Sequence, residues 1–129
     1  MQMYLLDTSV LVDYLRKKSN AASFLNSLDR ITLSLVSAGE LYQGARNRLE
    51  LKALDQFLKL CTIEPVTPAI SFEALELLRT HTLSAGLLIL DALIAATALS
   101  HGYTLVTANQ KHFRMIKKLS LAPWPRLEK

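Results

Sequence analysis

The chain has 129 residues, half of them hydrophobic, and its 15 Lys and Arg against 11 Asp and Glu give a formal net charge of +4. This length predicts one domain, residues 1–129, whose hydrophobic core can form without disulfides or structural metals. The single cysteine, Cys61, excludes an internal disulfide and favours a reducing, cytoplasmic compartment, and the start MQMYLLDTSV lacks the basic region of a secretory signal. The mild positive charge permits a polyanionic partner without requiring one.

The apolar pattern alternates between strand and helix along the chain. Its first half predicts strands at residues 2–6 and 31–36, and helices at 8–18, 20–29, 37–48 and 50–60. Its second half predicts strands at 62–66, 103–107 and 119–122, and helices at 67–83, 90–101 and 109–118. Thr67 is expected to cap its helix, which should bury Ile70, Leu75 and Leu78, and Gly102 should end the next helix. The expected fold class is α/β, with a mostly parallel sheet covered on both faces and a site at the carboxyl ends of its strands.

A lone carboxylate, Asp91, stands in the most apolar segment, residues 87–99, LLILDALIAATAL. An ionised acid costs several kcal/mol to bury without compensation, and no Lys or Arg lies between Arg79 and Lys111. The compensating group must therefore come from elsewhere in the fold or from a bound cation. The same charge makes a membrane span unfavourable, so a buried core helix is expected.

Four polar residues are candidates for a site: Asp7, Glu40, Asp91 and Asn109. Three of them follow predicted strands at the strand-to-helix edge, whereas the placement of Asp91 there is an inference, because no clear strand precedes it. Each has a simpler explanation: Asp7 and Asn109 as helix caps, Glu40 in a capping box with Ser37, and Asp91 beside a helix dipole. Yet Asp7 and Asp91 have apolar neighbours, and like charges gathered in one site require a cation or a raised pKa. Oxygen ligands suit Mg²⁺ or Mn²⁺, and such an ion in a basic protein fits hydrolysis of phosphodiesters.

Four segments together resemble the PIN domain, most closely VapC-type toxins of toxin–antitoxin pairs. They are YLLDTSVLVDYL at 4–15, SAGELYQGA at 37–45, LDALIAATAL at 90–99, and YTLVTAN at 103–109 continuing to His112 and Phe113. The resemblance covers nearly the whole chain in order. It implies a three-layer α/β/α sandwich and a Mg²⁺- or Mn²⁺-dependent endoribonuclease, with transfer RNA as one possible substrate. It also implies that Asp7, Glu40 and Asp91 are the metal-binding and catalytic acids.

Several neighbouring residues could support those acids. Ser9 or Thr8 could orient Asp7, and Thr107 could support the site, although local capping bonds explain these hydroxyls equally well. The family often has a fourth acid at the position of Asn109 or three residues later, where this chain has Asn109 and His112. Asn109 brings no charge, which puts a second metal in doubt. His112 is expected to be a surface residue, and Asp13 a solvated helix acid.

Two groups of cations are candidates for RNA contacts. Lys111, Arg114, Lys117 and Lys118 lie on the last predicted helix, and Arg46 and Arg48 follow Glu40 by about two turns. Tyr42 could stack on a base or pack in a subunit contact. The alternative for both groups is a solvated surface.

The resemblance further implies a homodimer and a VapB-like antitoxin that docks on exposed apolar residues of the helices at 8–28 and 37–60. Two other functions stay open on the residues alone. A phosphotransfer or phosphatase domain would use Asp7, but Ser9 stands where the second acid of haloacid-type phosphatases is expected. A binding module that kept the fold but lost its chemistry is favoured by Asn109.

Overall fold

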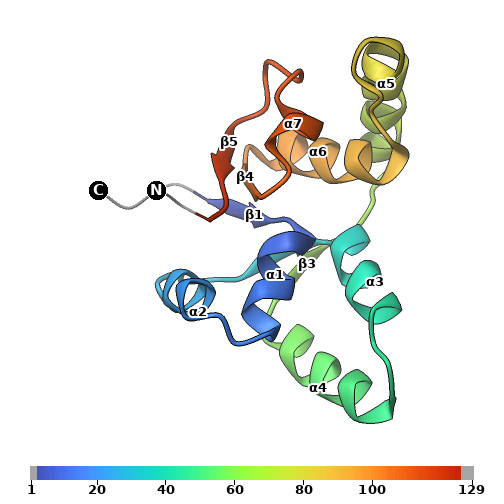
Figure 1. Ribbon diagram of the computed structural model, residues 1–129. Helices are drawn as coiled ribbons and strands as arrows, with labels where there is room; N and C mark the ends of the chain where they lie inside the picture. Colours follow the sequence, from blue (N-terminus) through green and yellow to red (C-terminus); the bar gives the residue numbers. More distant parts are fainter. Residues whose placement is uncertain (1–2, 126–129) are drawn as a thin grey trace.

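The computed structural model describes residues 3–125, in which short strands alternate with helices (Figure 1). The first half comprises β1 (Tyr4–Leu6), α1 (Thr8–Leu15), α2 (Ser19–Asn26), β2 (Thr32–Ser34), α3 (Leu35–Gln43), α4 (Arg48–Lys59) and β3 (Thr62–Glu64). The second half comprises α5 (Pro68–Ala85), α6 (Ile89–His101), β4 (Thr104–Thr107), α7 (Gln110–Phe113) and β5 (Leu121–Pro123).

All the strand pairs in this part of the chain are parallel. One sheet has the order β1-β4-β5, the other pairs β2 with β3, and β1 lies against β2. The pairing of β1 with β4 sets Leu5 opposite Leu105 and Leu6 opposite Val106. The predicted α/β class with a parallel sheet is therefore confirmed.

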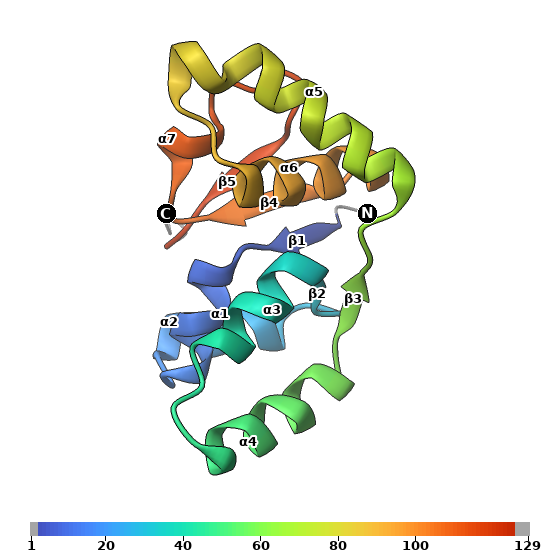
Figure 2. The same cartoon turned by 90° about the vertical axis from the view of Figure 1, so that its right-hand side faces the viewer.

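Successive residues of β1 and β4 face two different cores, as the two-residue period of a strand requires. Leu5 and Leu105 pack with α5, α6 and α7, whereas Leu6 and Val106 pack with α1, α2, α3 and α4. Figure 2 shows these two groups of helices on opposite sides of the strands. The three-layer sandwich predicted from the sequence is the observed arrangement.

Helix α6 carries the apolar segment that surrounds Asp91. Its small side chains let it pack closely against α5, and Ala92, Ala95, Ala96 and Ala98 are fully buried. Gly102 ends the helix in the left-handed conformation at φ 70°, as predicted. Between residues 3 and 125, no helix combines the length and the apolarity needed to cross a bilayer.

Most of the predicted helices are shorter than their sequence pattern suggested. Helix α1 ends at Leu15 because Lys17 adopts a left-handed backbone, at φ 62°. Helix α3 ends at Gln43, and a new helix begins after Asn47, whose side chain accepts the amide hydrogen of Glu50. Thr67 caps α5 as expected, by accepting the amide hydrogen of Ile70.

The prediction for α5 was wrong in the choice of buried residues. Ile70 is buried as predicted, but Ala74 and Leu77 complete the buried stripe, whereas Leu75 is exposed and Leu78 is partly buried. The stripe follows the helical spacing of four and three residues. Hydrophobicity alone favoured Leu75 over the small Ala74.

The helix predicted at 109–118 was also wrong, because α7 has only four residues. Beyond Phe113 the chain turns, with the Ile116 amide bonded to the Phe113 carbonyl and the Leu119 amide to the Ile116 carbonyl. These bonds let Phe113, Ile116 and Leu119 all enter the core that contains α5 and α6. The strand expected at 119–122 is consequently displaced to Leu121–Pro123.

Candidate functional site

Asp7 directly follows β1 and is almost completely buried, with 5% of its surface exposed. It occupies the cap position of α1, but its side chain makes no capping hydrogen bond. Instead, Asp7 Oδ2 accepts hydrogen bonds from Thr107 Oγ1 at 2.6 Å and from Ser9 Oγ at 3.4 Å. The capping explanation for Asp7 is therefore wrong, because its carboxylate faces the end of β4.

Thr107 ends β4 and links two of the sequence-predicted residues. Its hydroxyl donates to Asp7 and accepts the backbone amide of Asn109 at 3.0 Å. Asn109 occupies the N-cap position of α7, as the pattern predicted, but its exposed side chain makes no capping hydrogen bond. Parallel pairing of β1 with β4 is what brings the Thr107 hydroxyl to Asp7 across 100 positions of sequence.

Thr107→Val is expected to raise the Mg²⁺ concentration needed for half-maximal RNA cleavage by about 10- to 100-fold, the usual cost of losing a partner that orients a metal ligand. Valine keeps the shape but removes the donor to Asp7. Thr104→Val is the matched control, since the Thr104 hydroxyl in the same strand contacts Ser120 at 2.9 Å. A Mg²⁺ titration that is the same for both variants would contradict this role of Thr107.

Glu40 is held by Thr8 and not by Ser37 in a capping box. Helix α3 begins at Leu35, two residues earlier than predicted, because Ser34 Oγ accepts the Ser37 amide at 3.1 Å. The Thr8 hydroxyl donates to Glu40 Oε1 at 2.6 Å and lies 3.0 Å from Ser37 Oγ. Thr8 thus orients Glu40, whereas Ser9 contacts Asp7.

Asp91 lies in the first turn of α6 and is half-buried. Burial raises the pKa of its carboxyl; His112 opposes this rise, and the carboxylates of Asp7 and Glu40 add to it. The three acids are therefore close enough to interact. Asp91 also lies near the N-terminus of α6, where the helix dipole favours a negative charge. A role in a metal site and the helix-dipole explanation are therefore compatible.

His112 was expected at the surface; it is half-exposed, but its Nδ1 also lies 3.2 Å from Asp91 Oδ2. When protonated, this imidazole pairs with the carboxylate. The sequence held one signal for it, since His112 stands where the PIN family can have a fourth acid. The short α7 carries His112 to Asp91, because Phe113, the next residue, is anchored in the core.

The donor set at this edge of the sheet fits a hard divalent cation. It consists of carboxylate oxygens whose mutual repulsion a cation would relieve. Within residues 3–125, no three His, Cys, Asp or Glu side chains are arranged to ligate one ion directly. Glu40 and Asp91 instead contact Thr8 and His112. Mg²⁺ usually keeps several of its waters in protein sites, so the three acids need not all ligate the ion directly.

A groove of about 510 Å³ lies between α1, α3 and α4, and Glu40 is one of its lining residues. Its lining combines apolar and charged side chains, among them Val12, Arg16, Glu40, Leu41, Arg46 and Leu54. Leu41 and Leu54 are buried and Val12 is partly buried, which gives an apolar floor. Arg46, a predicted RNA contact, forms a local ion pair with Glu50 in the first turn of α4, at 2.8 Å from Nη2 to Oε2.

The other sequence-predicted residues lie around this edge or are engaged elsewhere. Lys111, Arg114 and Lys117 are exposed on α7 and the turn after it, and Arg48 is exposed at the start of α4. Lys118 contacts Glu73 at 3.4 Å, and the Tyr42 hydroxyl donates to Asp55 at 2.6 Å. The prediction that Asp13 is a solvated acid was wrong, because Asp13 Oδ2 accepts Trp124 Nε1 at 2.8 Å.

The chain is similar to known proteins along nearly its whole length. The family model of the PIN domain matches residues 4–119. Ribonuclease VapC1 of Methanocaldococcus jannaschii is 33% identical over 91% of this chain and 83% of its own length. Ribonuclease VapC19 of Mycobacterium tuberculosis is 36% identical over 91% of this chain and 97% of its own. The crystal structure of Rickettsia felis VapBC2 bound to a promoter DNA fragment superposes with a TM-score of 0.79 at 28% identity, covering 95% of this chain and 99% of that one.

Proposed function

This chain belongs to the PIN-domain family as a VapC-type member, and on that premise we propose that it is a metal-dependent endoribonuclease toxin that hydrolyses RNA phosphodiesters. The observation that supports the proposal is that the carboxylates of Asp7 and Glu40, from distant segments of the chain, raise the pKa of Asp91. Each has a side-chain partner that fixes it: Thr107, Thr8 and His112, respectively. An RNA substrate implies that the enzyme works in the cytoplasm; transfer RNA is a candidate.

Asp7, Asp91 and Glu40 would hold the Mg²⁺ or Mn²⁺. Bound there, the ion would activate a water for in-line attack on the phosphorus and offset charge on the leaving oxygen. Thr107 and Ser9 fix the Asp7 carboxylate, and Thr8 fixes that of Glu40, so these oxygens need little reorganisation to accept a cation. His112 reaches Asp91 from α7, so a bound cation would compete with its imidazole for that carboxylate.

The contacts of the site weigh against the two alternatives. A haloacid-type phosphatase needs a second acid where Ser9 stands, and the Ser9 hydroxyl is a donor to Asp7. A module without chemistry was favoured by Asn109, but its exposed side chain leaves the three carboxylates in place. The nuclease therefore accounts for more of the contacts.

Incubation of the purified chain with total RNA tests the proposal. Mg²⁺ or Mn²⁺ is expected to give discrete cleavage products, and EDTA to abolish them, because metal removal leaves three repelling carboxylates and no Lewis acid. Restoring the metal in excess over EDTA should restore the same products. Cleavage that persists in EDTA, or a stable phosphorylated Asp7 in place of cleavage, would contradict the proposal.

We also propose that a VapB-like antitoxin neutralises the chain. Relatives of this fold include VapBC complexes, such as that of Rickettsia felis. Exposed apolar residues suited to a docking segment lie on α1 and α4, including Leu15, Leu49 and Leu51.

A second copy of the chain is the proposed partner of the apolar face on α5. This face exposes Phe72, Leu75 and Leu83, and Leu88 and Ile89 are exposed shortly after the end of the helix. Single Leu75→Glu substitution is expected to convert a dimer into a monomer, since it would bury an unpaired charge in the interface. Light scattering after size exclusion measures the mass, with Leu60→Glu at the exposed end of α4 as the control. A wild type that is monomeric at all concentrations would contradict the dimer.

A further inference from the structure

Two arginines, Arg16 and Arg46, line the groove that contains Glu40, and they differ in whether the guanidinium is paired with a carboxylate. Arg46 is neutralised by Glu50: its Nε lies 3.2 Å from Oε2, its Nη2 lies 2.8 Å from the same oxygen, and its backbone amide donates to Oε1 at 2.9 Å. The pair engages two of the five N–H donors of the guanidinium and offsets its charge. This ion pair weakens the prediction that Arg46 binds RNA, because Glu50 already offsets the charge that would attract a phosphate.

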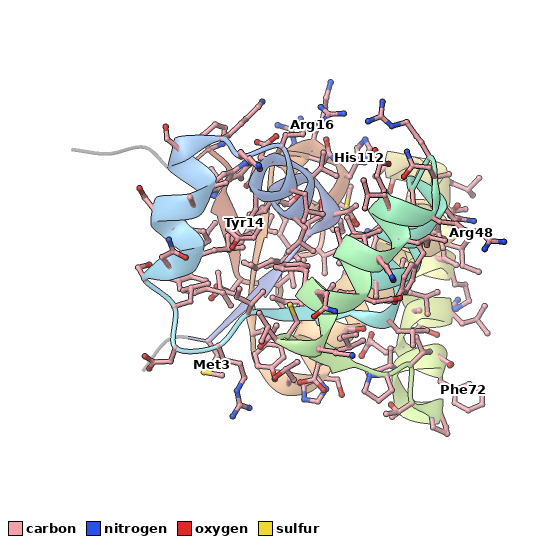
Figure 3. The ribbon with its side chains drawn as sticks, turned by 90° about the horizontal axis from the view of Figure 1, so that it is seen from below. Met3, Tyr14, Arg16, Arg48, Phe72 and His112 are labelled. Atoms are coloured by element: carbon pink, nitrogen blue, oxygen red, sulfur yellow. The ribbon has the colours of Figure 1, made fainter. Side chains whose placement is uncertain are left out.

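Arg16 lines the same groove from the end of α1. Within residues 3–125, its side chain forms no hydrogen bond and no ion pair. The charge of Arg16 helps to lower the pKa of Asp13, but that carboxylate already contacts Trp124 Nε1 at 2.8 Å and Lys18 Nζ, whose distance from Oδ1 is 3.4 Å. The five donors of the guanidinium thus remain available. In Figure 3, Arg16 lies at the same edge of the molecule as His112, which contacts Asp91, and away from Met3 and Phe72.

The surroundings of Arg16 fit one part of a nucleic acid. Val12, Leu41 and Leu54 give the groove an apolar floor on which the face of a base or sugar can lie. The planar fork of an arginine binds a phosphate through two parallel hydrogen bonds. Glu40, which lines the same groove, belongs to the proposed metal site.

We propose that Arg16 binds the phosphate of a nucleotide that flanks the scissile bond, with that nucleotide lying in the groove between α1, α3 and α4. This inference rests on the proposed function and assigns to it a substrate subsite. Arg16 holds single-stranded RNA in register with the acids. It binds ground state and transition state alike, so its loss should raise KM more than it lowers kcat.

Steady-state cleavage of a short single-stranded RNA tests the proposal. Arg16→Ala is expected to raise KM about tenfold with little change in kcat, and Arg16→Lys to recover part of the loss, because lysine keeps the charge without the fork. Arg79→Ala, which removes one exposed charge from α5, is the control and should leave both constants unchanged. Arg16 is exposed, so the variant should fold as the wild type does, which circular dichroism checks.

Direct binding separates failure of this inference from failure of the proposed function. Fluorescence anisotropy of labelled RNA is measured with Asp91→Asn protein, with and without Arg16→Ala, at several salt concentrations. Arg16→Ala is expected to weaken binding about tenfold and to reduce the slope of log K against log salt by about one. Weakened binding with an inactive wild type would contradict the nuclease but keep the RNA subsite. Unchanged binding and KM in an active nuclease would overturn the assignment of Arg16.

Discussion

Asp91→Asn is expected to lower the rate of RNA cleavage on the order of a thousandfold, which corresponds to roughly 4 kcal/mol of lost transition-state stabilisation. The amide has almost the shape of the carboxyl but brings no charge to the cation. Asp91 is the acid whose pKa is raised by burial and by both other acids. Replacing Asp91 by Asn should therefore also relieve the repulsion between its carboxylate and those of Asp7 and Glu40, so that the metal-free protein becomes more stable.

Initial rates at saturating Mg²⁺ measure the first effect, and thermal unfolding measures the second. Mg²⁺ should raise the Tm of the wild type but not that of Asp91→Asn, because a ligand stabilises only the state that binds it. Asp29→Asn is the matched control, since Asp29 is exposed in the turn before β2. Equal rates for Asp91→Asn and Asp29→Asn would exclude Asp91 from the metal site.

Leu105→Ala is expected to lower the free energy of unfolding by roughly 2–5 kcal/mol, out of a total of about 5–15 kcal/mol for a domain of this kind. Leu105 is fully buried at the centre of the β1-β4-β5 sheet, opposite Leu5 and Leu121. Truncation leaves a cavity between the sheet and α6 that close-packed neighbours cannot fill.

Urea unfolding at fixed protein concentration measures this loss. Leu49→Ala serves as the control, because Leu49 is 79% exposed and its truncation should change stability by less than about 0.5 kcal/mol. A similar small change in both variants would mean that the β4 strand contributes little to the packing described above.

The sequence predicted the parts of the site that depend on local pattern. Alternating apolar residues place the ends of β1 and β4, and therefore Asp7 and Thr107, at one edge of the sheet. The unusual position of Asp91 in an apolar helix is visible in the amino-acid sequence alone. The family resemblance connected these acids to Glu40, which lies in the middle of α3.

The remaining contacts depend on which side chains meet across the fold, and periodicity does not carry that information. The pairing of Arg46 with Glu50 could not be distinguished from two solvated charges, and the Thr8 hydroxyl could have faced either acid. The short α7 was missed because its polar sequence resembles a longer surface helix, whereas burial of Phe113 and Ile116 decides its length. His112 reaches Asp91 only because of that packing.

The distribution of the site over the two cores has a consequence for when activity can first appear during synthesis. Asp7 and Glu40 rest on the helices of one core, whereas Asp91 and His112 rest on those of the other. The Thr107 hydroxyl that fixes Asp7 lies 100 positions later in the chain. A nascent chain is made from its N-terminus, so it cannot assemble this edge until β4 has left the ribosome. A nuclease built in this way is expected to spare RNA near its own synthesis until nearly all of its chain is complete.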